Sequence, residues 1–123
     1  MLNVGESVLE IRRRLVARFG FEPWPDGDGE KLGIAANVKS GLMPINGLRI
    51  SPQNGTSGWF IWAGEEPLSR DADFFLPLHT SHLASWCTLA LPFLILPPGW
   101  RFLVTPHYED VWYDAELSLA GDD

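Results

Sequence analysis

Two pairs of carboxylates are the first candidates for chemistry: Glu65 with Glu66, and Asp71 with Asp73. Closely spaced carboxylates act as general acid and base where a cleft or a neighbouring charge separates their pKa values. Nothing around these residues indicates such a cleft, and the chain has neither a Gly-x-Ser-x-Gly elbow nor a phosphate-binding glycine loop. We therefore interpret them as a solvated acidic loop and expect no catalytic residue.

Three residues near the middle of the chain are possible zinc ligands: His79, His82 and Cys87. A structural zinc site needs four ligands, and no second pair of Cys or His completes this set. His79 and His82 straddle the expected start of a helix, so we expect them to hydrogen-bond the preceding loop. Cys87 falls on the apolar side of that helix, which favours a buried thiol over a reactive thiolate. These patterns predict no zinc site.

A second possible metal site is the loop at 22–30, where Asp26, Asp28 and Glu30 alternate with glycines. The twelve-residue calcium loop also needs a bidentate glutamate at its far end, and that spacing is missing. The prolines and glycines of the segment are typical of an irregular loop. We expect neither a metal nor a cofactor in this protein.

Charge is distributed unevenly along the 123 residues. Residues 1–61 carry seven Lys and Arg against six Asp and Glu, and residues 62–123 carry two against ten, so the net charges are +1 and −8. The acidic half repels phosphate backbones and anionic lipid surfaces, which argues against nucleic-acid and membrane binding. The same field accelerates association with a basic protein. A purely solubilising role for the acidic residues is the alternative.

Six tryptophans are more than a core of this size easily buries completely. Tryptophan often dominates the energetics of protein interfaces, and several of these rings fall in expected strands next to acidic loops. The candidate partner-binding residues are Trp62, Glu65, Glu66, Asp71, Asp73, Asp110, Trp112 and Asp114. The alternative is that the rings belong to the core, which we favour for Trp86 and Trp100 and leave open for Trp112.

The elements that must position these residues begin with an expected helix over residues 7–19. Ser7 and Glu10 have the spacing of a capping box, and Gly20 is a natural C-terminal stop. The apolar stripe at helical spacing consists of Val8, Ile11, Leu15 and Phe19. Four arginines cover the outer face, where Arg14 can pair with Glu10. We favour a solvated helix face over a basic contact patch.

Short apolar or β-prone runs follow at 32–38, 48–50, 59–62, 100–104 and 110–113. Asn46-Gly47 and Asn54-Gly55 are hairpin-type turn signals, so we expect the first three strands to form an antiparallel meander. The third run is apolar on both faces. This pattern predicts a central strand that is covered on both sides or presents one face to a partner.

A second helix is expected to begin at Thr80 or Ser81 and to end or kink near Leu91, because Pro92 lacks a backbone donor. The sequence thus predicts a single α+β domain, with an antiparallel sheet of about five strands packed with two main helices. Its segments are an N-terminal helix at 1–20, the sheet with the second helix at 31–116, and a tail at 117–123, of which we expect 121–123 to be frayed.

Four motifs occur in an order that resembles a known family. They are GWFIWAGEE at 58–66, DFFLPLH at 73–79, PPGWRFL at 97–103 and YEDVWYD at 108–114, with His82-Leu83 and Trp86-Cys87 between the second and the third. Over about residues 45–116 the chain resembles the immunity-protein-33-like family of bacterial polymorphic toxin systems. The N-terminal helix and the loop at 22–30 lie outside this resemblance. It implies a protein that binds and neutralises a cognate toxin, and it supplies no catalytic residues.

These observations favour an immunity protein that neutralises a toxin by protein–protein contact, and the acidic half favours a basic toxin. An acidic interaction domain with another partner is the second hypothesis, and an undetected hydrolase is the third. The single cysteine, Cys87, cannot form an internal disulfide. The first residues lack the pattern of a signal peptide, and the longest apolar run, 89–96, is interrupted by Pro92. We therefore expect a soluble, cytoplasmic, bacterial protein.

Overall fold

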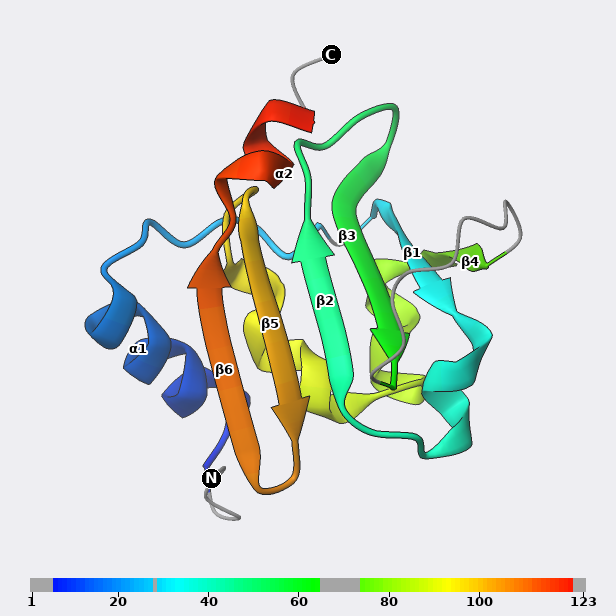
Figure 1. The fold of residues 1–123 in the computed structure, drawn as a ribbon, viewed down its shortest axis with the longest axis horizontal. Helices are drawn as coiled ribbons and strands as arrows, with labels where there is room; N and C mark the ends of the chain where they lie inside the picture. Colours follow the sequence, from blue (N-terminus) through cyan, green and yellow to red (C-terminus); the bar gives the residue numbers. More distant parts are fainter. Residues whose placement is uncertain (1–5, 28, 65–73, 121–123) are drawn as a thin grey trace.

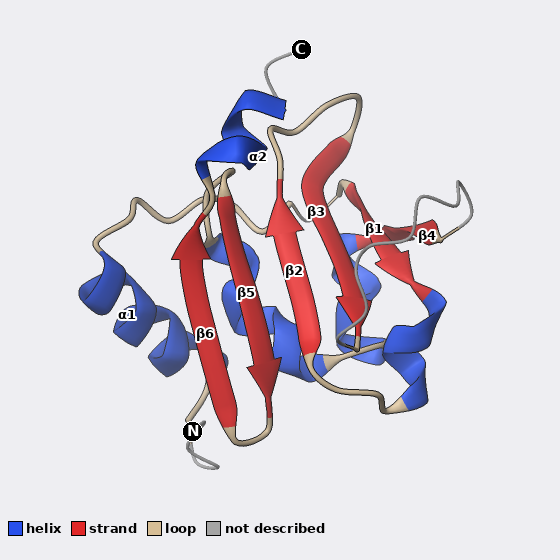
Figure 2. Cartoon of the chain, viewed as in Figure 1, coloured by secondary structure: helices blue, strands red, loops and turns tan. Residues whose placement is uncertain are grey.

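The computed structural model describes residues 6–27, 29–64 and 74–120, which form an α+β fold around one mixed sheet (Figures 1 and 2). The strands are β1 (Lys31–Ala35), β2 (Ile45–Arg49), β3 (Thr56–Ala63), β4 (Phe75–His79), β5 (Trp100–Thr105) and β6 (Tyr108–Tyr113). The helices are α1 (Val8–Phe19), the 3₁₀ helices η1 (Ala36–Ser40), η2 (Thr80–Ser85) and η3 (Thr88–Ile95), and α2 (Ala115–Ala120). The strand order is β4-β1-β3-β2-β5-β6.

The first helix, α1, agrees with its sequence signals. The Ser7 side chain accepts a hydrogen bond from the Glu10 backbone N–H at 3.1 Å, and the Glu10 carboxylate accepts one from the Ser7 N–H at 3.0 Å. Both halves of the predicted capping box are therefore present. Gly20 ends the helix with a φ of 72°, a left-handed conformation that glycine adopts without strain.

The sheet has six strands and is not fully antiparallel, so the prediction of a five-stranded antiparallel sheet is only partly right. The meander is wrong, because β1 pairs with β3 in parallel and β2 lies between β3 and β5. The additional strand, β4, covers the outer edge of β1. Asn54-Gly55 does form the turn between β2 and β3, with φ values of 48° and 80°.

Asn46-Gly47, the other predicted hairpin turn, lies inside strand β2. A methyl group at Gly47 would overlap the ring of Phe102, which lies against this strand from β5. The glycine therefore provides space for an aromatic ring, which is a common role of glycine within a sheet.

The expected second helix is replaced by two 3₁₀ helices, η2 and η3. Trp86 and the extended residue Cys87 separate them, and Pro92 lies inside η3 rather than at a helix end. A proline removes the i to i−4 hydrogen bond of an α-helix, and the shorter 3₁₀ turns avoid the need for a continuous ladder of such bonds. The first part of the expected tail at 117–123 is helical, because α2 extends to Ala120, and 121–123 lie outside the described residues.

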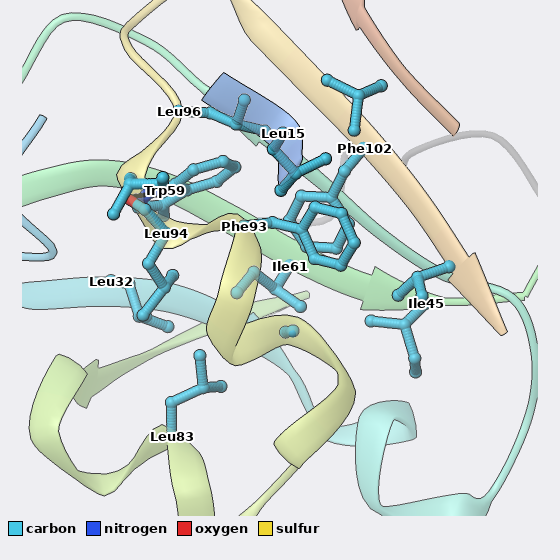
Figure 3. Close-up of a cluster of buried hydrophobic side chains, with 14 of the residues drawn as sticks. Leu15, Leu32, Ile45, Trp59, Ile61, Leu83, Phe93, Leu94, Leu96 and Phe102 are labelled. Atoms are coloured by element: carbon cyan, nitrogen blue, oxygen red, sulfur yellow. Dashed lines mark hydrogen bonds between the residues drawn. The ribbon is translucent and has the colours of Figure 1, made fainter. Parts of the chain in front are cut away.

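The main core lies between α1, η2 and η3 and one face of the sheet, here called the back face. Trp59 and Ile61 contribute from β3 and Phe102 from β5, and each is at most 1% exposed. Figure 3 shows Phe93 of η3 stacked on Phe102, with ring centroids 4.7 Å apart. A smaller cluster of Ala35, Leu48 and Trp62 lies on the opposite face, here called the front face, where Leu117 of α2 packs against it.

Candidate partner-binding site

Strand β6 places three of the predicted partner-binding residues on the front face. Alternate residues of a strand point to opposite faces, and Val111 of β6 belongs to the main core on the back face. Asp110, Trp112 and Asp114 therefore project forward, where Asp110 is exposed and the other two are half-buried. With Arg101 and Glu116 they form the β6 patch, which lies at one edge of the sheet.

Contacts within the β6 patch hold Trp112 and Asp114 in place. Arg101, the β5 neighbour of Trp112, places its guanidinium 5.5 Å from the centre of the indole ring. The same guanidinium donates to Asp114 Oδ2 at 3.2 Å, and Asp114 Oδ1 accepts from the Glu116 N–H at 3.1 Å. Asp110 has no ion-pair partner among the described residues. Its exposed carboxylate is therefore free to meet a partner.

Trp62, another predicted partner-binding residue, is only 5% exposed. Its ring lies in the front-face cluster and packs edge-on against Phe75, with centroids 6.3 Å apart. Strands β2 and β5 separate β3 from β6, so Trp62 lies away from the β6 patch. The structure thus gives Trp62 a packing role. Four further predicted residues, Glu65, Glu66, Asp71 and Asp73, lie outside the described residues.

The remaining tryptophans divide between core and surface. Trp86 and Trp100 are half-buried and pack against the main core, as the sequence predicted. Trp24 is 39% exposed in the loop after α1. Trp112 is half-buried and lies on the front face, which places it on the side of the sheet that α1 and η3 leave uncovered.

Contrary to the expectation from the sequence, the arginines of α1 do not all point freely into solvent. Arg14 pairs with Glu109 of β6 at 2.8 Å and with Glu6 at 2.9 Å, rather than with Glu10. These hydrogen bonds raise the pKa of Arg14 above its ordinary value. Arg12 binds Asp26 at 2.8 Å and the Leu91 carbonyl at 2.6 Å. Two of the four arginines thus connect α1 to the rest of the fold.

Arg49 is a buried residue whose role sequence reasoning missed. Arg49 is only 2% exposed, and its guanidinium donates hydrogen bonds to four backbone carbonyls. The acceptors are Ser57 at 2.8 Å, Leu94 at 3.0 Å, Leu96 at 2.9 Å and Pro25 at 3.1 Å. Burial lowers the pKa of Arg49 to about 10, so the guanidinium stays charged at neutral pH. The only sequence signal was an arginine between two apolar residues of a strand.

Among the described residues, the possible zinc ligands His79, His82 and Cys87 are not brought together as a metal site. His79 and His82 are exposed neighbours with ring centroids 5.6 Å apart. Cys87 is half-buried, and burial raises the pKa of its thiol, which disfavours the reactive thiolate. Within the described ranges, no group of three or more His, Cys, Asp or Glu residues is placed to hold a metal ion.

Comparison with protein families identifies the family of this chain. The model of the Imm33-like domain matches residues 11–114, which is most of the chain. The chain belongs to the Imm33-like domain family. The match confirms the resemblance drawn from the motifs and extends it, because it includes most of α1 and the loop at 22–30 in this Imm33-like domain.

Two other comparisons give no relative for this Imm33-like domain: no curated protein and no solved structure matches it. None of the helices in the described part of the chain is long and apolar enough to cross a membrane.

Proposed function

We propose that this Imm33-like domain is an immunity protein, which binds a cognate bacterial toxin and neutralises it by protein–protein contact. The observation that carries the proposal is the family match over residues 11–114. Immunity by direct binding needs a complementary surface and no catalytic group. The β6 patch supports this mode of action, because it combines a half-buried indole with an exposed carboxylate.

The proposed partner is a basic toxin. Residues 62–123 carry a net charge of −8, and this charge favours fast association with a basic protein. In the contact, Asp110 would meet a cation of the toxin, while Trp112 would contribute apolar area. Asp114 would act mainly through Arg101, which it orients at 3.2 Å. The acidic residues at 65–73 remain part of the proposed surface, and the cytoplasm is the proposed site of action.

Co-expression with a candidate toxin, chosen from the genes that neighbour this domain, tests the proposal. We expect growth arrest by the toxin alone and restored growth when both proteins are made. Purified domain should inhibit the toxin in proportion to its amount, with complete inhibition at about one domain per toxin. Inhibition by a catalytic trace of domain would indicate an enzyme instead. Unchanged toxicity, with both proteins present at similar levels, would refute the proposal.

A further inference from the structure

The sheet has two outer strands, β4 and β6, and they differ in their ability to accept another strand. An outer strand exposes backbone N–H and C=O groups that can pair with an extended segment of another chain. At β4, Pro77 stands opposite Gly33 in the middle of a five-residue strand. Its nitrogen has no hydrogen to donate, so β4 is a poor acceptor of a further strand.

Strand β6 is six residues long and contains no proline. The Asp114 N–H donates to the Gly99 carbonyl at 2.7 Å, on the side of β5. Because backbone groups alternate in direction along a strand, the N–H and C=O groups of Glu109, Val111 and Tyr113 point away from β5. Hydrogen bonds among the described residues leave these outward groups without partners. Figure 1 shows no strand on the outer side of β6; α1 lies beside β6 in this view, and its Arg14 pairs with the Glu109 side chain.

We propose that the cognate toxin binds by adding an extended segment to the outer edge of β6 as a seventh strand. This inference rests on the proposed function and specifies how the contact is made. The added strand would form backbone hydrogen bonds with Glu109, Val111 and Tyr113. Its forward-pointing side chains would lie beside Asp110 and Trp112, because neighbouring strands place side chains of the same face next to each other.

The chemistry of this edge defines the segment that it binds. Asp110 is exposed and has no ion-pair partner in the described structure, so a Lys or Arg beside it is favoured. Tyr108 and Tyr113, at the two ends of β6, are 53% and 52% exposed and offer apolar area to an aromatic or branched residue. A second copy of this chain is disfavoured, because it would bring two acidic edges together.

Residue-resolved hydrogen exchange of the labelled domain, alone and with an inactive variant of the cognate toxin, tests the added strand. In the free domain, we expect the amides of Glu109, Val111 and Tyr113 to exchange faster than those of Asp110 and Trp112, which face β5. In the complex, exchange of the three outward amides should slow by about tenfold or more, as expected for new backbone hydrogen bonds. The two inward amides serve as the internal reference.

The outcomes separate this inference from the proposed function. If a complex forms and the outward amides exchange at their free rates, the added strand is wrong while the immunity function stands. If no complex forms with the cognate toxin, the proposed function fails and the added strand fails with it.

A pair of variants at one position gives a second test. Tyr113→Pro removes an outward N–H, whereas Tyr113→Thr removes the same ring but keeps the N–H. We expect the proline variant to bind the toxin about tenfold more weakly than the threonine variant. Equal affinities of the two folded variants would overturn the added strand. Urea unfolding curves show whether both variants fold. If the proline variant does not fold, the exchange experiment on the unmodified domain tests the added strand.

Discussion

At the scale of single residues, Arg49 connects three segments that are far apart in the sequence. Its guanidinium binds carbonyls in the loop before β1, in β3, and in η3 with the residue that follows it. Trp24 and Trp59 lie beside it, with ring centroids 5.4 Å and 5.5 Å from its central carbon. Removing a buried charge from water is costly, and these contacts offset that cost. Arg49 therefore has a structural role, since its donors are already used within the fold.

Replacement of this side chain should strongly destabilise the domain. Arg49→Met keeps an unbranched apolar chain but removes the guanidinium that donates to four backbone carbonyls, three of which belong to buried residues. We expect the free energy of unfolding to fall by about 3–5 kcal/mol, measured by urea denaturation. Arg13→Met is the matched control, because Arg13 lies exposed on α1, and it should change the free energy by less than about 0.5 kcal/mol. Similar losses in the two variants would contradict the role given to Arg49.

At the scale of elements, the position of β2 between β3 and β5 depends on close packing at Gly47. The Phe102 ring of β5 occupies the space where a side chain at position 47 would begin. That ring also stacks on Phe93 and lies 5.5 Å from the Trp59 ring, so it cannot move without disturbing the main core. The Asn46-Gly47 pair, which is typical of a turn, thus serves the interior of a strand.

Gly47→Ala should lower the free energy of unfolding by about 1–3 kcal/mol, because the added methyl overpacks the core. The same substitution should cost less in a Phe102→Leu background, where the side chain that blocks the methyl is smaller. A double-mutant cycle with thermal or urea unfolding measures this coupling. An equal cost of Gly47→Ala in both backgrounds would show that the ring is not the reason for the glycine.

At the scale of the whole molecule, the paired arginines and the exposed acidic residue Asp110 lie on different sides of the sheet. The arginines Arg12 and Arg14 of α1 are paired on the helical side, whereas Asp110 stands free on the front face. A basic toxin is therefore expected to approach the β6 patch more often than the helical side. Salt should weaken this preference, because counterions screen exposed charges at distances beyond about 8 Å in physiological buffers.

Two charge-reversal variants distinguish the effect of charge in the β6 patch from the effect of the net charge of the protein. Asp110→Lys and Glu22→Lys change the net charge equally, but Glu22 is exposed in the loop after α1 and outside the β6 patch. We expect Asp110→Lys to slow toxin association by about tenfold at low salt, with a smaller effect of Glu22→Lys. Stopped-flow association at several salt concentrations measures both. Equal slowing by the two variants would mean that net charge, rather than the β6 patch, steers the toxin.

The predicted partner-binding residues show which positions in the fold can be predicted from local sequence patterns. Asp110, Trp112 and Asp114 alternate in sequence, and a strand with a period of two brings them to one face. The burial of Trp62 had no such signal, because the run 59–62 is apolar on both faces. Either of its faces could have met a helix layer, and the front-face cluster with Phe75 depends on β4, which joins the sheet next to β1.

The sequence by itself determined the features that depend on neighbours along the chain. These include the capped helix α1, the turn at Asn54-Gly55, the acidic second half and the family membership. Only the tertiary structure decided which strands pair, that Gly47 lies beneath a ring, and that Arg14 meets Glu109 across 95 positions of sequence. Such contacts join residues that no local period relates. They form because burying the apolar faces together leaves few arrangements that also satisfy the buried backbone groups and Arg49.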